Sequence, residues 1–315
     1  MSEAHARSLV LVSAHPERCL RRVTEAWVAP PSVRSIAVED LGALPLATIA
    51  MIDVDGLGSA AMAAATTRAQ RCPDRTLFVV PPAGSQALST ELAQLGSFRH
   101  VLSEQSRNLD FRLTIDRLLG DPDPGVQAYV PGVDLREHAL RGADDRQAAL
   151  ALVEDAAQAH SIPGRLTELA LTVAEELVTN ALYNAPVAPD GAPMYRHLSR
   201  ATPLPAPVRP PGRIQVACDG LTLVIAVRDA FGSFPLERID DDLRRMVQPS
   251  GHQVVGGEGG AGLGLVMAYR GVEHLHIDLV PGRSTQVIGI IGLQGGFRRF
   301  ARAGHSFNLF ISEDA

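Results

Sequence analysis

The strongest constraint on the fold lies in residues 169–184, where apolar side chains recur at the spacing of one helix face. This stripe, which predicts a buried amphipathic helix, consists of Leu169, Val173, Leu177, Ala181 and Leu182. Glu176 and Asn180 stand one turn apart on a neighbouring face, so a carboxylate and an amide oxygen point the same way. Such oxygens suit Mg²⁺, which takes one or two protein groups and keeps most of its waters. The alternative is a pair of solvated surface side chains.

A second segment, residues 256–265, reads GGEGGAGLGL and has glycine at six of its first nine positions. Glycine lets the backbone approach a phosphate closely and turn its N–H groups onto it. Leu263, Leu265 and Val266 then begin a predicted helix, whose positive end would face that anion. The alternative is a flexible surface loop.

Two further segments complete the pattern. The apolar strand of residues 221–229 ends in Asp229, with Gly232 just beyond. An aspartate there can accept a hydrogen bond from the exocyclic amine of adenine, and a nearby glycine lets a flat base lie against the backbone. Ser284 and Thr285 follow a tight turn and open another predicted strand.

In order, spacing and residue type, these four segments resemble the GHKL ATPase superfamily, which unites gyrase, the heat-shock chaperones, histidine kinases and mismatch-repair proteins. The resemblance covers roughly residues 135–311 and implies an α/β two-layer sandwich that binds Mg·ATP. It implies that Glu176 is the general base and that Asn180 is the magnesium ligand and an ATP-binding residue. The other positions that it implies for ATP binding are Asn184, Asp229, Gly232, Gly260, Gly262, Leu263, Gly264 and Thr285.

The chain departs from the family at one box. The family pattern D-x-G-x-G here reads D-A-F-G-S, so Phe231 and Ser233 replace both glycines. Phe231 either packs on the base or narrows the pocket and weakens nucleotide affinity.

The first 120 residues alternate strand-like and helical runs, which predicts a doubly wound parallel sheet. Expected strands include residues 8–14, 35–41, 48–56, 76–82 and 98–104, and expected helices lie near 16–28, 58–71, 86–95 and 108–119. This region resembles a response-regulator receiver domain, with Asp53 at the end of the third strand as the phosphoacceptor position and Asp55 two residues on.

The remaining receiver chemistry is absent from the sequence. Ser13, Ala14 and His15 replace the acidic pair that binds magnesium, and no lysine can follow the fifth strand, because all 29 basic residues are arginines. We therefore expect a degenerate receiver used for docking or dimerisation, rather than a working phosphoswitch.

The expected division is a receiver-like domain at 1–120, a Pro/Gly-rich linker at 121–134 and the ATP-binding domain at 135–315. A strand near residues 135–142 and a helix near 144–160 open the second domain. No apolar run is long enough for a membrane span and no signal-peptide layout occurs, so a cytoplasmic protein is expected. Three widely spaced cysteines, Cys19, Cys72 and Cys218, are expected in the core.

Residues 185–212 form a long proline-rich stretch beside the predicted magnesium helix. Such a loop is usually functional or disordered, so Tyr195, Arg196 and His197 are either partner contacts or part of a mobile excursion.

The absence of lysine means that any cation for the phosphates is an arginine. The candidates that flank the glycine segment are Arg244, Arg245 and Arg270, and the alternative for all three is a solvated helix surface.

Function depends on what surrounds the pocket. Only a short linker separates the two predicted domains, and neither His138 nor His160 has the context of a phosphoacceptor histidine. The E-x-V-T-N-A motif looks most like bacterial anti-sigma-factor serine kinases, which implies phosphorylation of Ser/Thr on a signalling partner, such as an anti-anti-sigma-like protein or a sigma factor, and suggests a homodimer. Two alternatives stay open: a non-catalytic ATP-binding switch or scaffold, and a histidine kinase core acting in trans. The net charge of -6 argues against broad nucleic-acid binding.

Overall fold

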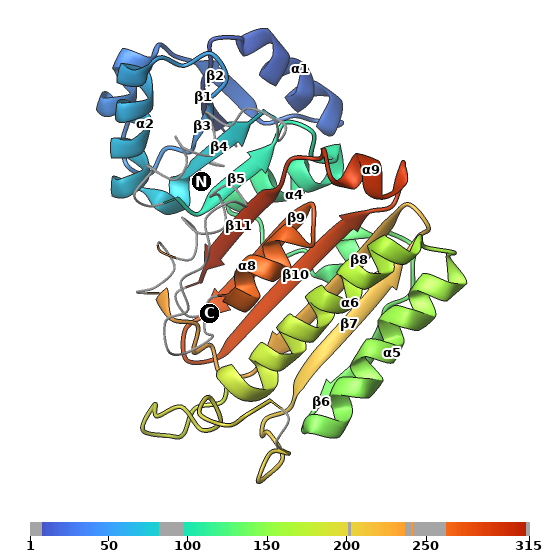
Figure 1. Cartoon of the computed structure of the whole chain (residues 1–315). Coiled ribbons are helices and arrows are strands. Elements are labelled where there is room, and N and C mark those ends of the chain that lie inside the picture. The colour runs from blue at the N-terminus through green and yellow to red at the C-terminus, as the bar shows by residue number, and fades with distance from the viewer. Residues whose placement is uncertain (1–7, 82–97, 201–202, 237–240, 242–262, 313–315) are drawn as a thin grey trace, which may run out of the picture.

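The computed structural model of the chain describes residues 8–81, 98–200, 203–236, 241 and 263–312, with Leu263 described by its backbone alone. These residues form one mixed sheet of 11 strands in the order β2-β1-β3-β4-β5-β11-β9-β10-β8-β7-β6 (Figure 1). The strands are β1 (Ser8–Val12), β2 (Ser32–Ser35), β3 (Ala50–Asp53), β4 (Thr76–Val80), β5 (His100–Ser103), β6 (Arg136–Leu140), β7 (Gly212–Cys218), β8 (Thr222–Asp229), β9 (His274–Val280), β10 (Ser284–Gly292) and β11 (Ser306–Ile311). Helices cover the sheet, so the α/β class expected from the sequence is confirmed.

Strands β1 to β5 pair in parallel, and the apolar runs of β1, β3, β4 and β5 are buried on both faces, whereas the edge strand β2 is mostly exposed. Alternate side chains serve the two faces, because successive residues of a strand point in opposite directions. Leu9, Leu11 and Met51 face α1 (Pro16–Ala26) and α4 (Asn108–Leu118). Val10, Ile52 and Phe78 face α2 (Ser59–Arg71). This arrangement follows the alternation of strands and helices in the sequence.

The strand expected at residues 35–41 is wrong. The pairing with β1 uses residues Ser32–Ser35 instead, and Val38–Ala43 forms the 3₁₀ helix η1. Val38, Leu41 and Leu44 recur every three residues, which is the period of a 3₁₀ helix, and Leu41 is fully buried. The helix expected near 86–95 lies outside the described residues.

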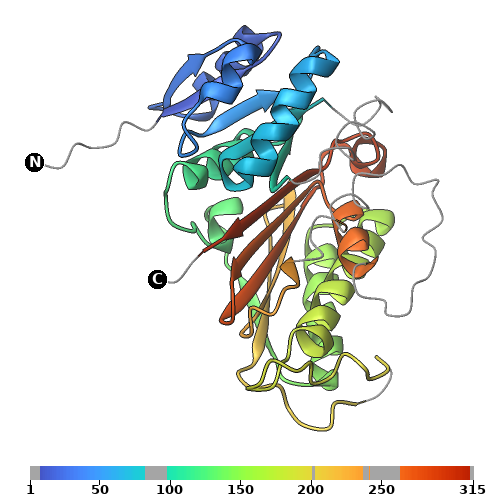
Figure 2. The ribbon, with the colours of Figure 1, turned by 90° about the vertical axis from the view of Figure 1, so that its left-hand side faces the viewer.

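Strands β6, β7, β8, β10 and β9 form an antiparallel array whose faces are covered differently. Helices α5 (Ala143–Ala159), α6 (Gly164–Thr179) and α8 (Leu263–Arg270) cover the face that carries Leu223, Ile225 and Val227 of β8 (Figure 2). Val224 and Ala226, one residue out of phase, belong to the opposite face. The short helix α9 (Gly296–Phe300) connects β10 to β11.

The segment expected as a linker packs against that opposite face. Residues Val126–Tyr129 form the 3₁₀ helix η3, and Val126, Tyr129 and Val130 are buried against β8 and β10. The proline-rich segment therefore completes a core, while the division of the chain into two domains stays a prediction.

The two halves of the sheet meet where β11 pairs in antiparallel fashion with β5 and in parallel with β9. Polar side chains fill this junction. His100, His274, His276 and Asn308 are each at most 1% exposed. The Asn308 amide lies 3.1 Å from His100 Nδ1 and 2.6 Å from His274 Nε2. From α4, Arg117 contacts both His276 and Asp278 of β9.

No helix within the described ranges is long and apolar enough to cross a membrane. All three cysteines are free and buried, as expected.

Candidate functional site

Helix α6 carries the predicted apolar stripe into the core and then changes its pitch. Ala170, Val173 and Leu177 are buried against the sheet, and the helix ends at Thr179. The chain continues as a π turn over Asn180–Asn184, closed by the Ala185 N–H donating to the Asn180 carbonyl at 2.8 Å. Such turns are rare and often occur at functional sites. Within the turn, Asn184 Nδ2 donates to Asn180 Oδ1 at 2.6 Å.

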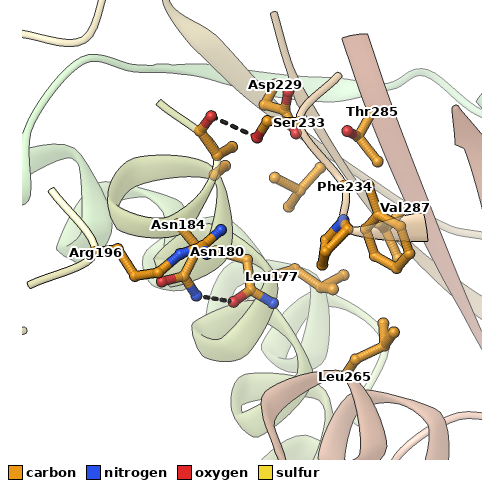
Figure 3. A pocket seen from close by; sticks show the side chains of 14 residues that line it. Leu177, Asn180, Asn184, Arg196, Asp229, Ser233, Phe234, Leu265, Thr285 and Val287 are labelled. Carbon is orange, nitrogen blue, oxygen red and sulfur yellow. Dashed lines mark hydrogen bonds between the residues drawn. The ribbon is translucent and has the colours of Figure 1, made fainter. Parts of the chain in front are cut away.

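A pocket opens between this turn and the sheet, with about 760 Å³ of empty space that includes its mouth. Four of the residues expected to bind ATP line it: Asn180 and Asn184 from α6 and its extension, Asp229 from β8 and Thr285 from β10. In Figure 3 the two asparagines lie on one side and Thr285, Val287 and Phe234 on the other. The apolar part of the wall consists of Leu177, Ala181, Ala185, Val227, Phe234, Pro235, Leu265 and Val287.

Asp229 is a buried acceptor at one end of this apolar space. Its Oδ1 accepts the N–H groups of Phe231 at 2.8 Å and Gly232 at 3.1 Å, and its side chain is 8% exposed. Burial raises the pKa of Asp229, although these two bonds and hydrogen bonds from Thr285, its neighbour across the β8–β10 ladder, act in the opposite direction. The second carboxylate oxygen keeps capacity to accept a donor.

Gly232 serves the backbone turn rather than the pocket wall. It has a φ of 58°, and a Cβ there would lie 2.2 Å from the Val280 carbonyl oxygen, so the β8 end can approach the β9–β10 turn only with glycine. The next residue, Ser233, donates its hydroxyl to the Ala185 carbonyl at 2.7 Å. This bond fixes the D-A-F-G-S turn to the π turn.

Among the described residues, the aromatic side chain that lines the pocket is Phe234, which the sequence reasoning missed. Phe231 is half-buried, packs against the main core and is not among the described residues that line the pocket, while its role toward a bound base stays a prediction. Phe234 directly follows the D-A-F-G-S box, so the five-residue pattern does not include it.

Glu176 lies one turn before Asn180, beside the start of α8. Its side chain is 14% exposed, and its buried Oε2 has no hydrogen-bond partner among the described residues. A Cβ added to Gly264 would lie 2.3 Å from that oxygen, so the glycine makes room for the carboxylate. The Arg200 guanidinium lies 3.8 Å from the same oxygen. The Glu176 carboxylate is therefore mostly buried, and no described residue hydrogen-bonds its Oε2.

Part of the predicted phosphate-binding segment lies outside the described residues. Gly260, Gly262, Arg244 and Arg245 lie outside the described residues, as does the Leu263 side chain. Arg270 is half-buried in the last turn of α8, at the end of the helix away from Gly264.

The long loop of residues 185–212 is packed at several points. Tyr195 is 4% exposed and its hydroxyl donates to the Ala206 carbonyl at 3.3 Å, so the expectation that it contacts a partner is wrong. Arg196 lines the pocket, whereas His197 is exposed. The loop thus contributes directly to the site.

Asp53 is placed at the end of β3, as expected, and is 1% exposed. Its carboxylate accepts hydrogen bonds from Ser13 Oγ at 2.7 Å, from Cys19 Sγ at 3.4 Å and from the Arg18 guanidinium at 2.9 Å. Arg18 also donates to Asp55 at 2.8 Å. The sequence reasoning missed Arg18, which stands in the first turn of the helix after β1 and so at the same sheet edge as Asp53.

No protein-family model and no curated protein matches this chain. Among solved structures, a pilus assembly-related protein from Burkholderia pseudomallei is similar at 20% identity with a TM-score of 0.27, over 38% of this chain and 93% of that protein. Within the described ranges, no group of three or more His, Cys, Asp or Glu side chains could hold a metal ion.

Proposed function

We propose that this chain binds Mg·ATP in the pocket between α6, β8 and β10 and phosphorylates Ser or Thr on a partner protein, in the manner of an anti-sigma-type serine kinase. One observation carries the proposal: residues from three separate segments, Asn180 with Asn184, Asp229 and Thr285, line a single pocket. Packing of an apolar core does not by itself require that polar residues so far apart in the sequence line the same cavity.

The residue types of the pocket wall support the proposal of an adenine site. Mostly apolar walls with a few placed polar groups are typical of small-molecule sites. Asp229 supplies a buried acceptor whose Oδ1 is held by two backbone N–H groups, which leaves the carboxylate able to accept an exocyclic amine. A magnesium ion would be held by Asn180, whose Oδ1 now accepts from Asn184 and would be released by a rotation of the Asn184 amide.

Glu176 is proposed as the general base. It would accept the proton of the partner's hydroxyl as that oxygen bonds to the γ-phosphorus and the bond from phosphorus to the β–γ bridging oxygen breaks, leaving ADP. Its buried Oε2, which no described group hydrogen-bonds, is available for that proton. Glu176 and Asn180 sit one helical turn apart, so base and metal ligand reach the same phosphoryl group.

The architecture supports the same proposal. The strand order β2-β1-β3-β4-β5 is that of flavodoxin-like doubly wound folds. We assign it to a degenerate receiver-like domain, whose acceptor carboxylate is held by Arg18, and the antiparallel array with its helices to the GHKL domain. The partner is then a cytoplasmic signalling protein, either an anti-anti-sigma-like substrate or a sigma factor, and neither a nucleic acid nor a membrane. A homodimer belongs to the same proposal.

A second function, a non-catalytic ATP-binding switch or scaffold, is favoured by one observation. Phe234 and Pro235 occupy part of the pocket wall directly after the altered D-A-F-G-S box. If they narrow the site, nucleotide binds weakly and no transfer follows.

The test compares Glu176→Gln with Asn180→Ala, using Glu168→Gln, an exposed position on the same helix, as the control. Radiolabelled ATP is incubated with each protein and a lysate from its own cell, and the labelled protein and residue are identified. Glutamine keeps the shape of Glu176 but cannot accept the proton, so Glu176→Gln lowers transfer roughly 10²–10⁴-fold with nucleotide affinity preserved. Asn180→Ala lowers both. Equal transfer by wild type and Glu176→Gln, at saturating ATP and partner, would remove the catalytic assignment.

A further inference from the structure

The loop of residues 185–212 places an arginine at the proposed base. Arg200 NH1 lies 3.8 Å from Glu176 Oε2, beyond hydrogen-bond distance. Arg200 is 42% exposed, so its guanidinium keeps access to the space in front of the carboxylate. The positive charge of Arg200 therefore lies near the Glu176 carboxylate, but the two side chains do not form a hydrogen bond.

The backbone at Arg200 is fixed from two sides. Its carbonyl oxygen accepts the Tyr183 hydroxyl at 3.4 Å and the Arg146 guanidinium at 3.3 Å. Tyr183 belongs to the π turn, and Arg146 is itself held by Glu175 of α6, through a 2.8 Å bond from its Nε. These contacts tie the loop to the helix that carries Glu176 and Asn180.

The composition makes an arginine necessary at such a site. The chain contains no lysine, so a cation that neutralises a polyphosphate must be a guanidinium. Arg146, a second guanidinium beside this part of α6, is already paired with Glu175, and Arg196 lines the pocket beside Asn180 and Asn184. Among the described residues, Arg200 lies within 4 Å of the Glu176 carboxylate and has no hydrogen-bonded carboxylate of its own.

We propose that Arg200 binds the terminal phosphate of the nucleotide. This inference rests on the proposed function, because it needs a nucleotide in the pocket. Arg200 would then be a specificity-determining residue that lies outside the four sequence segments of the ATP-binding pattern. In this structure the guanidinium lies 3.8 Å from Glu176. A triphosphate, which carries more negative charge than one carboxylate, draws it away, and Glu176 is left free to accept a proton. Arg200 therefore distinguishes a triphosphate from a diphosphate.

The test measures the affinities of ADP and of a non-hydrolysable ATP analogue with Mg²⁺ for wild type, Arg200→Ala and Arg302→Ala. Arg302 is an exposed arginine beyond α9 and controls for the lost charge. Losing a charge-assisted bond to the γ-phosphate weakens analogue binding by roughly 10- to 100-fold in Arg200→Ala and leaves ADP binding unchanged. Arg302→Ala leaves both affinities unchanged.

Three outcomes separate the inference from the proposed function. If wild type binds neither nucleotide, the proposed function fails. If wild type binds both and Arg200→Ala loses neither affinity, or loses both equally, the terminal-phosphate role is refuted and the nucleotide site stands. A selective loss of analogue binding, with the thermal unfolding midpoint preserved, supports the inference, because a merely structural role for Arg200 would not discriminate between the two ligands.

Discussion

Replacing Asp229 by Asn tests the adenine pocket at one atom. The carboxylate is buried, and its Oδ1 already accepts from Phe231 and Gly232, at 2.8 and 3.1 Å. Asparagine keeps an oxygen for those two bonds, so the turn survives, but its amide then directs a donor at the amine of the base. The lost charge-assisted bond plus the clash of two donors is worth about 2–4 kcal/mol. The dissociation constant for ADP therefore rises roughly 30- to 900-fold.

The same strand supplies a matched control at its other end. Asp219 Oδ1 accepts the Leu221 and Thr222 N–H groups at 2.8 and 2.7 Å, so Asp219→Asn makes the same chemical change in the same kind of turn away from the pocket. Titration calorimetry with Mg·ADP, together with the thermal midpoint of each protein, measures both variants. Unchanged ADP affinity in a folded Asp229→Asn protein would show that another group reads the base, and a similar loss in Asp219→Asn would trace the effect to turn stability.

Three further predictions follow from other parts of the structure. Gly264→Ala moves the Glu176 carboxylate, since the new Cβ would lie 2.3 Å from the flexible end of that side chain, and so lowers phosphotransfer but changes the free energy of unfolding by less than about 1 kcal/mol. Gly232→Ala places its Cβ 2.2 Å from a backbone atom in a left-handed conformation, which lowers the free energy of unfolding in urea by about 2–4 kcal/mol. Equal stability of the two variants would contradict this contrast. Burial lowers the pKa of His100 to about 3, although its hydrogen bond to Asn308 acts in the opposite direction, so only the unfolded state protonates this histidine between pH 6.5 and 3. The free energy of unfolding therefore falls by about 2 kcal/mol between pH 6.5 and 5 from His100 alone. Urea titrations at the two pH values should show a smaller difference for His100→Gln. Asp53 does not accept a phosphoryl group from acetyl phosphate and Mg²⁺, because Ser13, Cys19 and Arg18 already occupy its oxygens; an intact mass higher by one phosphoryl group, absent in Asp53→Asn, would overturn the degenerate-receiver proposal.

Sequence periodicity predicted most elements that bury one continuous apolar face. The stripe of α6 and the runs of β1, β3, β4 and β8 were located to within a few residues, because each is a regular apolar pattern bounded by turn residues. The failure at residues 35–41 has a local cause. Apolar residues spaced by two or three fit both a strand and a 3₁₀ turn, and only pairing with β1 decides between them.

Residues of the candidate pocket were predicted only where they belong to a short local sequence motif. Asn180, Asp229 and Thr285, which line the pocket, were predicted because their motifs are local, whereas the positions of Phe234 and of the proposed residue Arg200 depend on how a turn and a long loop fold over the helix. Arg18 was missed for a similar reason: its pairing with Asp53 joins residues that are far apart in the sequence. Pairings across a sheet edge are set by tertiary packing, which single-sequence patterns do not encode.

The joining of the two half-sheets could not be predicted, and its chemistry explains why it is specific. Strand β11 pairs with β9 at six positions but with β5 at only two, so the backbone ladder holds the β5 side weakly. A one-residue slip there would reverse every side chain, and an apolar seam would resist such a slip only through packing. The buried contacts of Asn308 with His100 and His274 change this, because a slip would leave polar groups unpaired in the core, at about 1–3 kcal/mol each. The polar junction therefore selects one register between the halves, which the short β5–β11 ladder could not select alone.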